Sequence, residues 1–181
     1  MVAPTVNAIY DSRKFERLEP LIQEFHNQGI SYKIWDAINV ENVVTSINLS
    51  HKAIIADAKA KGLPMVTVCE DDLYFPSLNG WKYYVDNMPK SFDLYLGCTF
   101  IPPISNNKVC GFHLYTVHEN FYDKFLSAPE DQHIDVAMDD LKGNYVFCYP
   151  FPALQRPGYS FNNPGAIVNY NSVLQEQDIY K

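Results

Sequence analysis

Apolar residues along the chain follow two patterns, which alternate. Short, nearly continuous apolar runs predict strands, and they cover residues 5–10, 32–37, 65–69, 93–97, 109–117 and 145–149. Apolar residues at helical spacing predict helices between these runs, over residues 15–28, 50–61, 81–88, 120–127 and 134–141. Pro20 removes one hydrogen bond from the first helix, which therefore begins near Glu19 or bends there. Strands that alternate with helices predict one α/β domain with a mainly parallel sheet.

The clearest strand is Met65-Val66-Thr67-Val68-Cys69, because an almost unbroken apolar run is typical of a parallel strand covered on both faces. Ser50 is the expected N-cap of the helix before it, and Gly62 follows that helix as a C-terminal stop. The polar residues 39–48 indicate a loop.

Three carboxylates, Glu70, Asp71 and Asp72, follow this strand directly. Their mutual repulsion raises their pKa values unless a cation or hydrogen bonds intervene. Ligands of open α/β sheets bind outside the carboxyl ends of the strands. Strand alternation sends Glu70 and Asp72 to one side and Asp71 to the other, so that pair is placed to share Mg²⁺ or Mn²⁺. The alternative is a solvated acidic loop that caps the following helix.

Composition and charge limit the classes of partner that we expect the chain to bind. A hydrophobic fraction of 47% with 19% charged residues is ordinary for a globular protein, and a net charge of -7 has the wrong sign for a general nucleic-acid binder. No apolar run approaches the roughly 20 residues that span a bilayer, and no basic segment followed by an apolar one begins the chain. We expect a cytoplasmic protein without a transmembrane segment, with peripheral membrane contact left open. The four cysteines are expected to be buried thiols, the alternative being a zinc site or a disulfide.

A specific resemblance rests on the central block of the sequence. Ser50-His51-Lys52-Ala53-Ile54, then Gly62-Leu63-Pro64, then the apolar strand ending in Glu70-Asp71-Asp72 closely resembles the signature of glycosyltransferase family 25. That family makes lipooligosaccharide and collagen-type sugar linkages. Weaker matching pieces flank this block, namely Arg13-Lys14 with Arg17-Leu18-Glu19, residues 92–97, residues 111–115, His133-Ile134-Asp135, and residues 152–155 with Tyr159-Ser160.

Two departures from the family pattern touch the expected nucleotide pocket. Ile47-Asn48-Leu49 stands where the family carries Gly-Cys, and Tyr10-Asp11 stands where its first strand ends in Asn-Leu. The identity of the donor therefore stays open even if the fold is that of the family.

The resemblance implies a GT-A domain over residues 1–163, Rossmann-like with a mainly parallel sheet flanked by helices, and a mobile C-terminal tail over residues 164–181. It implies transfer of a hexose, with galactose expected, from a UDP-sugar to a hydroxyl of a glycan or lipooligosaccharide acceptor with inversion. A bound Mn²⁺ or Mg²⁺ would neutralise the leaving diphosphate.

Residue roles follow from the same resemblance and from the chemistry. The metal is assigned to Asp72, Glu70 and His113, although His113 also fits a core histidine. The base is assigned to Asp135, with Asp139 and Asp140 competing. The donor is assigned to Tyr10, Arg13, Arg17, Glu70, Asp71, Gln155 and Ser160. Ser50 and His51 are expected to cap and pack the helix behind the acidic strand.

Two other functions remain open. A metal-dependent nucleotidyl or phosphoryl transferase would also place carboxylates beside a parallel strand, but the sequence holds no Gly-x-x-x-x-Gly-Lys loop for phosphate. A catalytically degenerate member of the family would bind a glycan or a partner without turnover.

Overall fold

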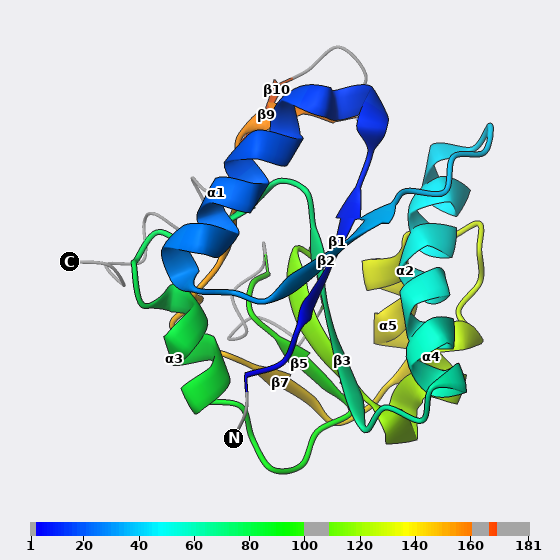
Figure 1. The fold of residues 1–181 in the computed structure, drawn as a ribbon. Coiled ribbons are helices and arrows are strands. Elements are labelled where there is room, and N and C mark those ends of the chain that lie inside the picture. Colours follow the sequence, from blue (N-terminus) through cyan, green and yellow to red (C-terminus); the bar gives the residue numbers. More distant parts are fainter. Residues whose placement is uncertain (1–2, 100–108, 161–166, 170–181) are drawn as a thin grey trace.

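The central feature of the fold is a six-stranded sheet. A computed structural model describes residues 3–99, 109–160 and 167–169. The strand order is β2-β1-β3-β6-β5-β7 (Figure 1). These strands are β1 (Val6–Tyr10), β2 (Tyr32–Asp36), β3 (Met65–Glu70), β5 (Leu94–Leu96), β6 (Leu114–His118) and β7 (Tyr145–Phe147). Only β6 runs antiparallel to its neighbours in this sheet, so the predicted α/β domain with a mainly parallel sheet is confirmed.

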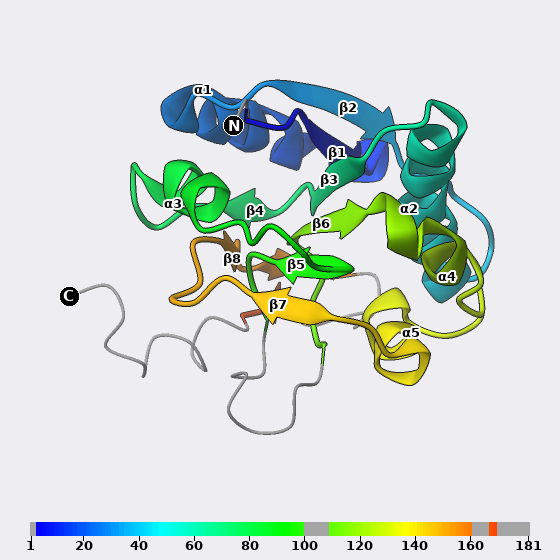
Figure 2. The same ribbon diagram turned by 90° about the horizontal axis from the view of Figure 1, so that it is seen from below.

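Helices cover both faces of the sheet. Figure 2 shows α1 (Leu18–Gln28) and α3 (Gly80–Asp86) on one side, and α2 (Val43–Ala60), α4 (Tyr122–Leu126) and α5 (Ile134–Leu141) on the other. The alternation of side chains along each strand feeds both cores. In β3, Val66 and Val68 pack toward α2, whereas Cys69 packs toward α1. This two-sided burial explains why the strand is apolar at nearly every position.

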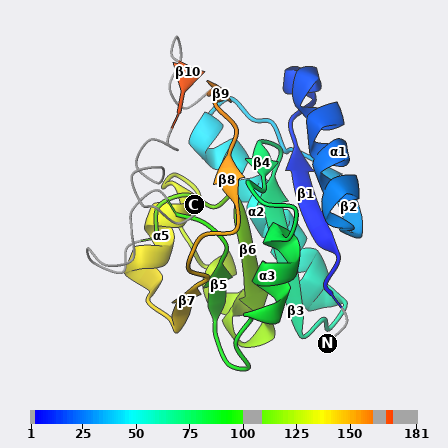
Figure 3. The ribbon, with the colours of Figure 1, turned by 90° about the vertical axis from the view of Figure 1, so that its left-hand side faces the viewer.

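Short strands bring the end of the described chain back to the end of β3. The pair β4 (Leu73–Tyr74) and β8 (Leu154–Gln155) is antiparallel, as is the pair β9 (Gly158–Tyr159) and β10 (Ile167–Val168). Figure 3 shows β8 beside β4, with β9 and β10 beyond it. Two-residue strands carry no periodic signal, and the sequence did not predict them. The predicted tail, residues 164–181, lies outside the described residues except for 167–169.

The structure shows how the first helix accommodates Pro20. The 3-10 helix η1 (Ser12–Arg17) precedes α1, and Pro20 stands at the third position of α1, where its missing N–H has no intrahelical partner to lose. Gly29 ends α1 in the left-handed region at φ = 66°, a conformation that favours glycine.

The start of α2 corrects the sequence prediction. This helix begins at Val43, and its N-cap is Asn42, whose Oδ1 accepts a hydrogen bond from the Thr45 amide. Ser50 lies in the middle of the helix, and the predicted loop over residues 39–48 is wrong from Val43 onward. Two of the polar residues that suggested a loop, Ser46 and Asn48, are buried side chains with hydrogen-bond partners, as is Ser50.

The strand predicted over residues 109–117 is shorter in the structure. It begins at Leu114, because Gly111 adopts a φ of 99° that interrupts extended pairing. The backbone before it is held by side chains instead of a neighbouring strand. The Val109 amide donates to Asp139 Oδ1, and the Gly111 amide donates to Asp135 Oδ2.

Two smaller predictions can also be compared with the structure. All four cysteines are free thiols, with Cys69, Cys98 and Cys148 buried and Cys110 half-buried, and the cluster of potential metal ligands found among the described residues contains none of them. None of the described helices is long and apolar enough to cross a membrane.

Candidate functional site

A cleft lies at the end of the sheet where the parallel strands β1 and β3 finish. One wall is charged and is formed by Asp11, Arg13, Lys14, Arg17, Glu70, Asp71 and Asp72. The facing wall comes from the loop between β2 and α2 and from the first turns of α2, and it is formed by Ala37, Ile38, Asn39, Val43, Ser46, Ile47 and Ser50. A charged wall opposite an apolar, hydroxyl-bearing wall suits a ligand with one anionic part and one flat, weakly polar part.

All three carboxylates of the acidic triplet line the cleft, with Glu70 at the end of β3 and Asp71 and Asp72 in the turn that follows. Glu70, Asp72 and His113 each offer one ligand atom within 4.8 Å of the others, so the structure brings together the three residues assigned to a metal. His113 Nδ1 lies 2.8 Å from Glu70 Oε2 and 3.8 Å from Asp72 Oδ1. Asp71 instead accepts the Asp11 amide on its Oδ2 at 3.0 Å.

These three residues fit a divalent cation. Oxygen and nitrogen ligands lie about 2.1 Å from Mg²⁺ or a similar ion, so two ligands of one ion are roughly 3 to 4 Å apart. The 3.8 Å between His113 Nδ1 and Asp72 Oδ1 agrees with that spacing, whereas the 2.8 Å between His113 Nδ1 and Glu70 Oε2 is that of a hydrogen bond. Asp72 Oδ1 is buried and accepts no hydrogen bond from the described residues. A buried carboxylate oxygen without a donor is costly, and a cation near it would remove that cost.

Two histidines hold the carboxylate of Glu70. Its Oε2 contacts His113 Nδ1 at 2.8 Å, and its Oε1 contacts His51 Nε2 at 3.3 Å. Burial alone raises the pKa of Glu70, but these two hydrogen bonds and the charges of the histidines outweigh burial and place that pKa far below its usual range. Burial lowers the pKa of His113, but the hydrogen bond to Glu70 and the nearby carboxylates outweigh it, so the pKa of His113 is raised.

Arg17 bridges the other two carboxylates. Its Nη1 donates to Asp71 Oδ1 at 2.7 Å and to Asp72 Oδ2 at 2.8 Å. Burial and then the charge of Asp72 raise the pKa of Asp71, and the hydrogen bonds from Asp11 and Arg17 offset this only in part. The carboxylates of Glu70, Asp71 and Asp72 therefore carry more negative charge than the guanidinium of Arg17 balances.

The closing segment of the described chain reaches the same cluster. Gln155 Nε2 donates to Asp72 Oδ2 at 2.9 Å, and the Arg156 amide donates to the Asp72 carbonyl at 2.6 Å. Arg17 Nη2 donates to the Tyr159 carbonyl at 2.7 Å. Ser160 lines the cleft. The pairing of β4 with β8 is what returns Gln155 and Ser160 to the acidic strand, more than eighty residues away in sequence for Gln155.

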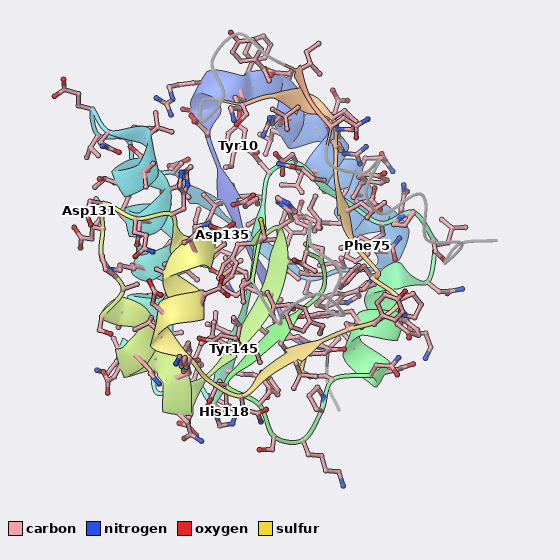
Figure 4. The ribbon with its side chains drawn as sticks, turned by 180° about the vertical axis from the view of Figure 1, so that it is seen from behind. Tyr10, Phe75, His118, Asp131, Asp135 and Tyr145 are labelled. Carbon is pink, nitrogen blue, oxygen red and sulfur yellow. The ribbon has the colours of Figure 1, made fainter. Side chains whose placement is uncertain are left out.

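Asp135 and Asp139 lie one helical turn apart in α5, with Asp135 in its first turn. Asp135 does not line the cleft, but its charge contributes to the raised pKa of His113. Figure 4 shows Asp135 toward the same end of the sheet as Tyr10, with His118 toward the opposite end. Both carboxylates hold backbone amides of the segment that leads to His113, at 2.8 Å for Asp135 and 2.7 Å for Asp139.

The remaining predicted donor residues lie at the end of β1. Arg13 lines the cleft and forms an ion pair with Asp11 at 2.6 Å. Tyr10 is buried and is absent from the cleft lining, whereas its neighbour Ile9 lines the cleft, because adjacent strand residues face opposite sides of the sheet. The stacking role of Tyr10 stays a prediction.

Sequence reasoning missed how α2 shapes this site. Ser50 Oγ accepts the Ile38 amide at 2.8 Å, and Ser46 Oγ accepts the Val40 amide at 2.9 Å, so two helix hydroxyls hold the cleft wall in place. The available signal was the run of hydroxyl and amide residues at helical spacing, although the same residues also fit a loop followed by an N-cap.

The fold of the chain is similar to the folds of known proteins. No family model matches the chain, and no curated protein matches its sequence. A glycosyltransferase involved in the glycosylation of the major capsid of PBCV-1 has a similar structure, with a TM-score of 0.53 at 13% identity over 87% of this chain and 95% of that one. A197 from STIV is similar with a TM-score of 0.51 at 15% identity over 80% of this chain and 81% of that one.

A Drosophila β-1,4-galactosyltransferase 7 mutant in complex with manganese, UDP-Gal and xylobiose has a TM-score of 0.49 at 12% identity, over 81% of this chain and 66% of that one. The fold assignment rests on the two structures with the higher scores. The chain thus shares the α/β fold of these two structures, one of which is a glycosyltransferase.

Proposed function

We propose that this chain is a metal-dependent glycosyltransferase related to family 25, with residues 1–163 as its transferase domain. It would move a hexose, most simply galactose, from a UDP-sugar to a hydroxyl of a glycan or lipooligosaccharide acceptor with inversion. The observation that carries this proposal is the cluster of Glu70, Asp72 and His113 beside a cleft with both a charged and an apolar wall. The fold of the chain agrees with it.

The residues of the cleft divide the binding of the donor between them. Asp72, Glu70 and His113 would hold Mn²⁺ or Mg²⁺, which when bound supplies Lewis-acid stabilisation to a leaving diphosphate. Arg13 and Arg17 offer guanidinium donors to the phosphate oxygens. The apolar wall over residues 37–47 suits the base and ribose. Gln155 and Ser160 close the cleft from the side of β8.

The acceptor needs a group that takes its hydroxyl proton as the bond to the sugar forms. We assign this role to Asp135, with Asp139 as its competitor, since a carboxylate within hydrogen-bond reach of the acceptor oxygen serves as a general base. Both lie in α5, beside the segment that leads to His113.

The first test is binding and turnover with defined donors. The protein is incubated with each of several UDP-sugars and Mn²⁺, and thermal stability and UDP release are measured, with chelated metal as the control. We expect a Mn²⁺-dependent rise in melting temperature and UDP release with one donor. No stabilisation by any UDP-sugar would contradict the proposal and favour a phosphoryl or nucleotidyl transferase. Stabilisation without turnover across many acceptors would favour a binding protein without catalysis.

The hydroxyl of Ser50 gives a prediction for the apolar wall. Ser50→Ala removes the acceptor of the Ile38 amide and frees the backbone that faces the donor. Loss of one such hydrogen bond costs about 1 kcal/mol, so we expect KM for the UDP-sugar to rise about fivefold with kcat nearly unchanged. Ser127→Ala is the matched control, because that hydroxyl is exposed and bonds only within α4. A fall in kcat with constant KM in Ser50→Ala would contradict this assignment.

A further inference from the structure

A buried histidine that lines the cleft beside the candidate metal site has no part in the reaction described above. His51 lies in α2 and is 1% exposed. Its ring stacks on Tyr115 with centroids 5.6 Å apart and meets the edge of Phe112 at 6.0 Å. Both of its nitrogens have partners: Nδ1 lies 2.6 Å from the Tyr115 hydroxyl, and Nε2 lies 3.3 Å from Glu70 Oε1. Packing alone would not require a partner at each end of the ring.

The chemistry of Tyr115 sets the direction of these hydrogen bonds. The phenol hydroxyl of Tyr115 is buried 2.6 Å from Nδ1 of His51, and a phenol hydroxyl is a hydrogen-bond donor. When this hydroxyl donates to Nδ1 of a neutral His51, the ring proton is on Nε2. Nε2 then donates to Glu70 Oε1. The tyrosine thus selects the tautomer of the histidine that holds the carboxylate.

The consequence concerns the other oxygen of Glu70. Because His51 binds Oε1, the carboxylate plane is fixed with Oε2 toward His113 and the oxygens of Asp72. Hydrogen bonds from outside the first layer of ligands orient metal-binding carboxylates in this way. We propose that His51, supported by Tyr115, is a positioning residue that aims Glu70 at a divalent cation. This inference rests on the metal site of the proposed function, and it gives the Ser-His motif a role beyond capping and packing.

Two substitutions of His51 separate positioning from packing. Both His51→Gln and His51→Asn replace the ring with a side-chain amide. The longer glutamine places its amide nitrogen near the position of Nε2, within reach of Glu70. The shorter asparagine places its amide near Nδ1, within reach of Tyr115 only. The measurement is Mn²⁺ affinity at fixed pH, from the electron paramagnetic resonance signal of free Mn²⁺, together with the melting temperature.

We expect His51→Asn to weaken Mn²⁺ binding by about 10-fold or more and His51→Gln to stay close to wild type, at similar melting temperatures. Equal affinities in the two variants, with normal Mn²⁺ binding by the wild type, would overturn the positioning role and leave the metal site standing. Absence of Mn²⁺ binding by the wild type would overturn the metal site and the inference with it.

A second variant keeps the inference testable if the histidine substitutions prevent folding. Tyr115→Phe retains the ring and removes only the hydroxyl that selects the tautomer. We expect weaker Mn²⁺ binding in this variant at unchanged secondary structure. Unchanged Mn²⁺ affinity in a folded Tyr115→Phe protein would overturn the part of the inference that assigns the support to Tyr115.

Discussion

Replacement of Asp72 by Asn is expected to lower sugar transfer by about 10² to 10³-fold. Asp72 carries the one carboxylate oxygen of the candidate cluster that is buried without a donor among the described residues. The amide is nearly the same size but has no negative charge, so it would hold a cation poorly and leave the charge of the leaving diphosphate less well neutralised. The measurement is kcat from UDP release, together with Mn²⁺ affinity.

Asp71 provides the matched control. It is adjacent in sequence and also accepts a hydrogen bond from Arg17, but its second oxygen faces the Asp11 amide and it is not part of the ligand cluster. We expect Asp71→Asn to raise KM for the donor and to leave Mn²⁺ affinity near that of the wild type. If Asp72→Asn retained both donor affinity and transfer, the metal-dependent mechanism would be refuted.

The parts of the fold that the sequence predicted well are those whose burial leaves a regular pattern. The strand over residues 65–69 was identifiable because both of its faces are buried and nearly every position is apolar. The helix over residues 134–141 was predicted with its observed bounds because its apolar residues, Ile134, Ala137 and Met138, recur at helical spacing on the side that is buried.

The elements that sequence patterns misplaced are those where tertiary contacts replace local signals. Residues 43–49 form a helix although they are rich in polar side chains, because Ser46 and Asn48 find partners in neighbouring segments when the chain folds. Val109 and Gly111 are apolar or small, as a strand would require, but carboxylates of α5 bind their amides instead. Hydrophobic periodicity does not encode such long-range hydrogen bonds.

The candidate site was predictable to the same extent. The position of three carboxylates after a buried strand predicted an acidic cluster, and the resemblance to a known family added Gln155 and Ser160, which the structure brings to the same cleft. The link from His51 to Glu70 was not predictable, because it joins the middle of a helix to the end of a strand 19 residues later. Only the three-dimensional packing of α2 against β3 and β6 brings these side chains together.

The identity of the general base gives the second large prediction. If Asp135 takes the proton of the acceptor hydroxyl, Asp135→Asn is expected to lower kcat by about 10² to 10⁴-fold while Mn²⁺ affinity and KM for the donor change little. The amide keeps one oxygen that accepts the Gly111 amide, so the backbone hydrogen bond at 2.8 Å survives the change. The measurement is kcat at saturating donor and Mn²⁺, followed by donor and metal titrations.

Asp139→Asn is the decisive comparison, because Asp139 makes an equivalent bond to the Val109 amide at 2.7 Å from the next turn of the same helix. If both carboxylates had a purely structural role, kcat would stay near that of the wild type in each variant, because each asparagine keeps an oxygen that accepts the backbone amide. If one of the two carboxylates is the general base, the two variants differ, because only the variant that lacks the base loses kcat at constant metal affinity. If that variant is Asp139→Asn, the base is Asp139 and the assignment of Asp135 is wrong, because a carboxylate that transfers the proton cannot be replaced by an amide that has no basic oxygen.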